Sequence, residues 1–138
     1  MGPNQAEIIR VSTREFGSPV SDVTLDPNKN AEVVVEVEAG TAVFGMGAHW
    51  RLGVHVHDLD GGTLPLVLAP TPTLHGHMNE PGDAWDHPSK TFKYTIEKAT
   101  LAGHEGHLGR VHAYLLVGTN AANYDATFVE SEPFLVLP

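Results

Sequence analysis

The chain has 138 residues, of which 17 are acidic and 8 basic, so its formal net charge is -9. This length fits a single domain, and the 41% of hydrophobic residues is enough to build one core. The few basic residues form no cluster, so we expect neither nucleic acid nor an anionic membrane as a partner. The sequence has no cysteine, which excludes disulfides, thiolate metal sites and a cysteine nucleophile.

Targeting signals are absent from the sequence. No apolar run approaches the roughly 18 residues of a membrane-spanning helix. The first nine residues also lack the basic and apolar regions of a signal peptide. We therefore expect a cytoplasmic location.

Five segments alternate apolar and polar residues with a period of two, which is typical of half-buried strands. In chain order they are 32–38, 51–58, 91–98, 110–118 and 127–137. In the last segment the alternation slips near Glu132, which predicts a bulge or a change of edge there. The residues that we expect to face the core are Val33, Val35, Val37, Leu52, Val54, Val56, Phe92, Tyr94, Ile96, Val111, Ala113, Leu115 and Val117.

The segments between these strands contain turn residues rather than helical patterns. A Gly-Gly pair within 60–63 predicts a hairpin from the 51–58 strand to a short strand at 64–68. Residues 119–125 connect the last two strands. Short strands at this spacing, without helices, predict an all-β, two-sheet antiparallel sandwich formed by one domain over residues 1–138.

In strand number, in length and in a tryptophan, Trp50, that opens the central strand, the sequence resembles immunoglobulin-like domains. The cysteine pair of that family is absent. The resemblance concerns the fold and implies no activity. A small cupin-like or jelly-roll barrel is the alternative fold, because the pair His55 and His57 on a strand is similar to the His-x-His of cupins, although the other spacings differ.

Residues 70–90 interrupt the strand pattern with a long segment that contains four prolines. Long loops in compact domains often carry function. We expect this loop to contact a ligand or partner through His75, His77, Trp85 and His87, with Trp85 as the aromatic anchor. A polar loop without a binding role is the alternative.

The nine histidines of the chain exceed the roughly three or four that average composition gives. His55 and His57 point to the same face of their strand. If strands 51–58 and 110–118 are neighbours, His112 joins that face, and pairing of the last strand places Glu132 opposite His112. Three imidazoles and a carboxylate suit zinc or another divalent transition metal. A solvated polar face is the alternative.

One further pair, His104 and His107, lies in a glycine-rich connection and is a weaker metal candidate than His55, His57 and His112. The sequence as a whole favours a non-catalytic binding or interaction module. The alternatives are a small metal-binding protein or metal-dependent enzyme that uses the His55 face, and a subunit that buries this face in a homo-oligomer.

Overall fold

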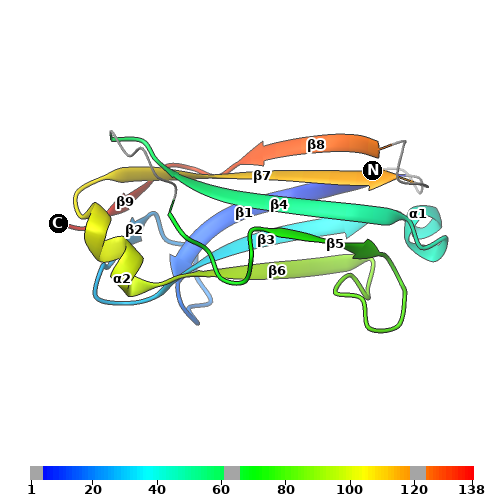
Figure 1. The fold of residues 1–138 in the computed structure, drawn as a ribbon, viewed down its shortest axis with the longest axis horizontal. Coiled ribbons are helices and arrows are strands. Elements are labelled where there is room, and N and C mark those ends of the chain that lie inside the picture. The colour runs from blue at the N-terminus through cyan, green and yellow to red at the C-terminus, as the bar shows by residue number, and fades with distance from the viewer. Residues whose placement is uncertain (1–4, 61–65, 119–123) are drawn as a thin grey trace.

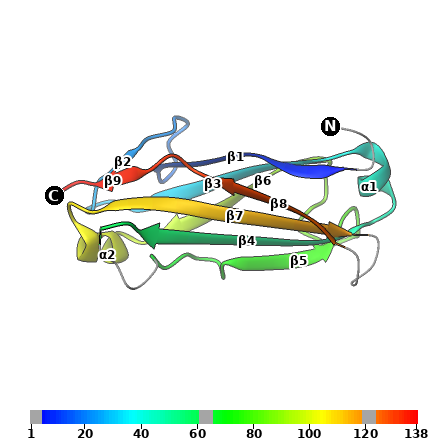
Figure 2. The same ribbon diagram turned by 90° about the horizontal axis from the view of Figure 1, so that it is seen from above.

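The computed structural model describes residues 5–60, 66–118 and 124–138. Two β-sheets pack face to face in these residues and form an immunoglobulin-like β-sandwich (Figures 1 and 2). The expected fold class is therefore confirmed. No helix in the described ranges is long and apolar enough to cross a membrane.

The smaller sheet has three antiparallel strands in the order β1-β3-β6. Their bounds are β1 Ala6–Glu15, β3 Ala31–Ala39 and β6 Ser89–Ile96.

The larger sheet has six strands in the order β2-β9-β7-β4-β5, with β8 also paired to β7. Their bounds are β2 Thr24–Leu25, β4 His49–Asp58, β5 Thr73–His77, β7 Leu108–Gly118, β8 Tyr124–Glu130 and β9 Phe134–Val136. The pair β2–β9 is parallel, so the sheet is not antiparallel throughout. The expected neighbours, strands 51–58 and 110–118, do pair as β4 and β7.

Within the described residues, two short helices and one 3-10 helix connect the strands. They are α1 Thr41–Gly45, α2 Lys98–Leu101 and η1 Ala102–His104. The last two form a continuous connection that leads to β7 at one end of the sandwich (Figure 2).

The core lies between the sheets and contains all thirteen residues that the alternation predicts. Each of them is at most 9% exposed. The slip near Glu132 also has a structural counterpart, because β8 ends at Glu130 and β9 begins at Phe134. Both strands pair with β7, at different ends.

Strand β1 is missing from the expectations because its alternation is broken. A bulge between Ile8 and Arg10 shifts the register, so that the buried residues Ile8 and Val11 lie three residues apart and not two. A buried polar residue, Thr13, further weakens the apolar pattern of the strand.

The expectation of a loop without strand structure over 70–90 is wrong in part. Residues 73–77 form β5, which pairs with β4. The turn that follows is held by Asp83, whose carboxylate accepts hydrogen bonds from the Trp50 indole N–H and from the backbone N–H groups of His77 and Trp85. The predicted hairpin at 60–63 and connection at 119–125 lie largely outside the described residues.

Candidate functional site

The outer face of the large sheet gathers six of the nine histidines. Adjacent strands place these side chains opposite one another: His49 with His77, and His55 with His112. We call this surface the histidine face. Its members are His49, Arg51, His55, His57, His75, His77, Arg110, His112, Tyr114, Phe128 and Glu130.

Two aromatic rings lie at the centre of one half of the histidine face. The Tyr114 and Phe128 ring centroids are 6.5 Å apart, and Phe128 is 76% exposed. Tyr114 is stacked with His55, with 18° between the ring planes. The tyrosine ring occupies the space above Gly53, where any Cβ would collide with it. The absence of a side chain at position 53 therefore allows Tyr114 to lie flat against the sheet.

The remaining imidazoles border these rings. The His57 and His112 ring centroids are 4.8 Å apart, and His112 Nδ1 lies 3.4 Å from a Glu130 carboxylate oxygen. Together the residues line a hollow of about 400 Å³. This volume lies within the usual range of small-ligand sites.

The structure brings the predicted residues His55, His57 and His112 to one face, but it does not bring Glu132 to them. His112 pairs with Glu130 instead, so the expected register of the last hairpin is wrong by two residues. A shift of two residues keeps the side chain on the same face, and Glu130 therefore takes the place expected for Glu132.

The other half of the histidine face contains His75 and His77, two of the loop residues that we expected to contact a ligand or partner. The His77 ring lies 3.9 Å from that of His49, centroid to centroid. With Arg51 these three histidines line a second hollow of about 300 Å³. His75 and His77 therefore belong to the sheet surface and not to a free loop.

Trp85 is not a surface anchor. Its side chain is fully buried and packs edge-on against the rings of Trp50 and Phe92. The expectation that it contacts a partner is wrong, because the turn held by Asp83 directs the indole into the core. His87, two residues later, is exposed and lies in none of the histidine groups described above.

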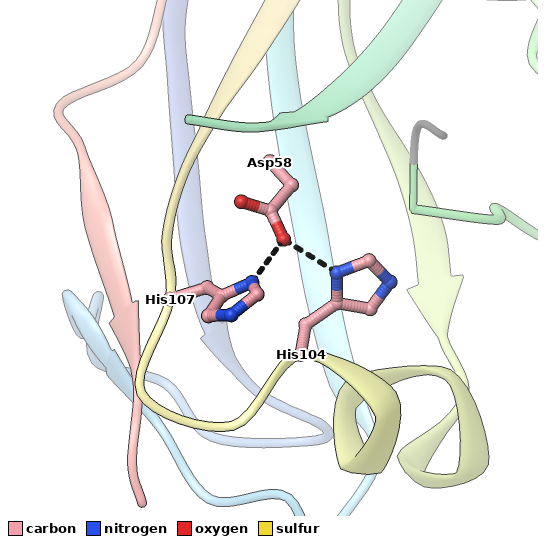
Figure 3. A group of neighbouring side chains, drawn as sticks. All are labelled: Asp58, His104 and His107. Carbon is pink, nitrogen blue, oxygen red and sulfur yellow. Dashed lines mark hydrogen bonds and ion pairs between the residues drawn. The ribbon is translucent and has the colours of Figure 1, made fainter. Parts of the chain in front are cut away.

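A separate cluster lies at the end of the sandwich where β4 stops. Asp58, the last residue of β4, has a side chain that is 1% exposed. Its Oδ2 lies 2.6 Å from His104 Nδ1 and 2.5 Å from His107 Nδ1 (Figure 3). In the described part of the chain, this is the one group of three or more His, Asp or Glu ligand atoms that all lie within 4.8 Å of one another. These three residues could hold a metal ion.

The environment of Asp58 favours its ionised form. Burial on its own raises the pKa of this carboxyl, but hydrogen bonds from His104 and His107 and from the Asp60 N–H outweigh burial and lower the pKa to about 2. Asp58 is therefore a carboxylate at neutral pH.

Sequence reasoning did not find Asp58, although a signal was present. Residue 58 has the same parity as Leu52, Val54 and Val56, whose side chains face the core. A carboxylate on the apolar side of a strand requires polar partners. That requirement points to a nearby pair of side chains such as His104 and His107.

The fold is a two-sheet β-sandwich. No protein-family model and no curated protein matches the sequence. Among solved structures, the chain is similar to AggA, the major subunit of aggregative adherence fimbriae type I from Escherichia coli. The TM-score is 0.54 and the identity 9%, over 96% of each chain. It is also similar to the C-terminal domain of wzt, with a TM-score of 0.50 and 15% identity, over 100% of this chain and 75% of the other. At these identities the likeness shows the fold alone.

Proposed function

We propose that the protein is a non-catalytic binding module whose ligand lies on the histidine face and is a neutral, polyhydroxylated molecule such as an oligosaccharide. The observation that carries this proposal is the pair of rings Tyr114 and Phe128 on the outer side of a sheet, bordered by imidazoles, with Phe128 exposed and Tyr114 partly exposed. Exposed aromatic rings offer flat apolar surfaces with a negative face. The C–H faces of sugar rings are suited to pack on such surfaces.

The polar groups of the face match hydroxyl groups. A neutral imidazole has one hydrogen-bond donor and one acceptor, as a hydroxyl group also donates and accepts. The Arg51 guanidinium has no hydrogen-bond or ion-pair partner among the described residues, and it adds donors. Glu130 forms an ion pair with Arg110 at 3.5 Å, so these two charges offset each other. The many imidazoles disfavour an entirely apolar ligand.

The two hollows favour an extended ligand. Along β4 they lie about six residues apart, at His49–Arg51 and at His55–His57. At the rise of a β-strand this separation is about 20 Å. One chain of several sugar rings could reach both hollows, whereas a single small molecule could not.

Titration of ¹⁵N-labelled protein with oligomers of glucose, mannose and N-acetylglucosamine tests the proposal. We expect at least one oligomer to shift amide signals of β4, β7 and β8, and Tyr114→Ala and Phe128→Ala to remove the response. The matched control is Val20→Ala, which truncates another exposed apolar side chain, 67% exposed, away from the face.

Three outcomes would contradict the proposal. The first is that none of the three oligomers shifts these amides, and the second is that the shifts survive in both ring variants. The third is a concentration-dependent dimer, seen by light scattering, that Phe128→Ala dissociates. That result would make the histidine face an interface between copies of the chain.

A further inference from the structure

We propose that Asp58, His104 and His107 form a binding site for one zinc ion or another divalent first-row transition ion, with Asp58 Oδ2 and the two Nδ1 atoms as ligands. The site is separate from the histidine face. It lies at the end of the sandwich, where Asp58 is on the inner side of the sheet (Figure 3).

The backbone between the two histidines determines their approach to Asp58. Glu105 has φ -56° and ψ 133°, and Gly106 has φ 78°, which is the geometry of a type II turn that needs glycine at this position. The turn is closed by the His107 N–H, which donates to the His104 carbonyl at 3.0 Å. The turn therefore brings residues i and i+3, both histidines, onto one carboxylate.

The three proposed ligand atoms all lie within 4.8 Å of one another, and a small outward movement of the imidazoles would make room for an ion. The two nitrogen atoms lie 2.5 and 2.6 Å from the same oxygen, shorter than the usual 2.7–2.9 Å of charge-assisted hydrogen bonds. Ligand atoms about 2.0–2.1 Å from a tetrahedral zinc ion lie roughly 3.3 Å apart. An ion would therefore need each imidazole to move outward by about 0.7 Å. Both rings have solvent on one side, since His104 is 21% and His107 is 40% exposed.

The charge of the site also favours a cation. The described residues contain one other buried carboxylate, Glu32, whose oxygen lies 2.7 Å from the Arg14 guanidinium. Asp58 has no Lys or Arg partner among the described residues, and only imidazoles contact its Oδ2. A divalent ion would supply the positive charge that Arg14 supplies to Glu32.

The surroundings hold the carboxylate in place. The other Asp58 oxygen, Oδ1, accepts the Asp60 N–H at 2.8 Å. The Asp60 side chain in turn accepts the N–H of Leu108, the residue after His107. Such outer contacts orient the ligands of metal sites.

The donor set indicates the type of ion. Two imidazole nitrogens and one carboxylate oxygen suit zinc, cobalt, nickel or copper, and do not suit calcium or magnesium, which prefer oxygen ligands. Three protein ligands with the rings facing solvent leave a fourth position for water.

Isothermal titration of the full, untagged, metal-free chain with zinc tests the site. We expect one ion per chain, and His104→Gln and His107→Gln each to weaken its binding by more than about tenfold. Both replaced side chains are partly exposed, so these variants should fold, which circular dichroism checks. With cobalt we expect the visible absorption of a tetrahedral site, lost in both variants, and calcium should not bind there.

The matched controls are His87→Gln, an exposed histidine outside the site, and His55→Gln/His57→Gln on the histidine face. Both should bind zinc as the unaltered chain does. The proposal is overturned if the unaltered chain takes up no zinc or if His104→Gln and His107→Gln leave the affinity unchanged. Loss of binding in the His55/His57 variant would also overturn it and place the ion on the histidine face. None of these outcomes depends on whether oligosaccharides bind.

Discussion

The two sides of the large sheet are built from alternate residues of the same strands, yet they have different roles. On the inner side of β4, Leu52, Val54 and Val56 have no exposed surface. On the outer side, His55 and His57 lie at a surface hollow. The difference teaches that the residues of the core and those of the proposed binding surface are separated here by a single residue step. Changes on the inner side should lower stability, and changes on the outer side should affect binding alone.

The largest loss of stability that we expect is that of Trp85→Ala, which tests whether the indole belongs to the core. It removes a fully buried ring that packs on Trp50 and Phe92. We expect the free energy of unfolding to fall by about 3–5 kcal/mol, as measured by urea denaturation. His87→Ala, two residues away and exposed, should change it by less than about 0.5 kcal/mol. A small effect of Trp85→Ala on the free energy of unfolding would contradict the burial of this residue in the core.

A smaller loss of stability should follow the protonation of Asp58, the charged residue on the inner side. It is measured in protein kept free of metal with a chelator. The pKa of Asp58 is about 2 in the folded chain and about 3.9 in an unfolded one, so the unfolded chain binds this proton more readily. The stabilisation is therefore complete above pH 4 and is lost as the pH falls through 4 towards 2. The loss should amount to about 2 kcal/mol.

The control for this pH effect is Asp58→Asn, which has no such proton to bind. Its unfolding free energy should vary less with pH between 4 and 2 than that of the unaltered chain, in denaturant titrations at each pH. If the unfolding free energies of the two proteins changed with pH in parallel, Asp58 would not contribute to the pH dependence of stability.

The smallest change in stability should come from substitutions on the outer side. The double substitution His55→Ala/His57→Ala removes side chains that contact solvent and neighbouring rings, and not the core. We expect a change of less than about 1 kcal/mol for the pair, measured by the same denaturation. A larger loss would mean that the imidazoles stabilise the sheet and would weaken the separation of the two sides.

The alternation of residues predicted the sandwich, the core and the grouping of His55, His57 and His112, because a period of two determines the face of each side chain. It did not predict β1, where a bulge interrupts the period. It also could not choose between Glu130 and Glu132, because both have the same parity and the register depends on the length of a turn.

The burial of Trp85 and the cluster at Asp58 depend on contacts between distant parts of the chain. Trp85 turns inward because Asp83 binds the indole of Trp50, 33 residues earlier. His104 meets Asp58 across 46 residues. In the sequence each of these residues stands alone, because its partner lies tens of residues away. Only the folded chain brings the partners together.

The glycine under Tyr114 has a consequence for how the molecule can change over generations. Gly53 is buried and its own atoms carry no binding group. A Cβ at this position would overlap with Tyr114 Cε1, so the tyrosine ring would have to move from its present place. A single heritable replacement at position 53 would thus displace the Tyr114 ring while leaving Phe128 and every histidine of the face unchanged.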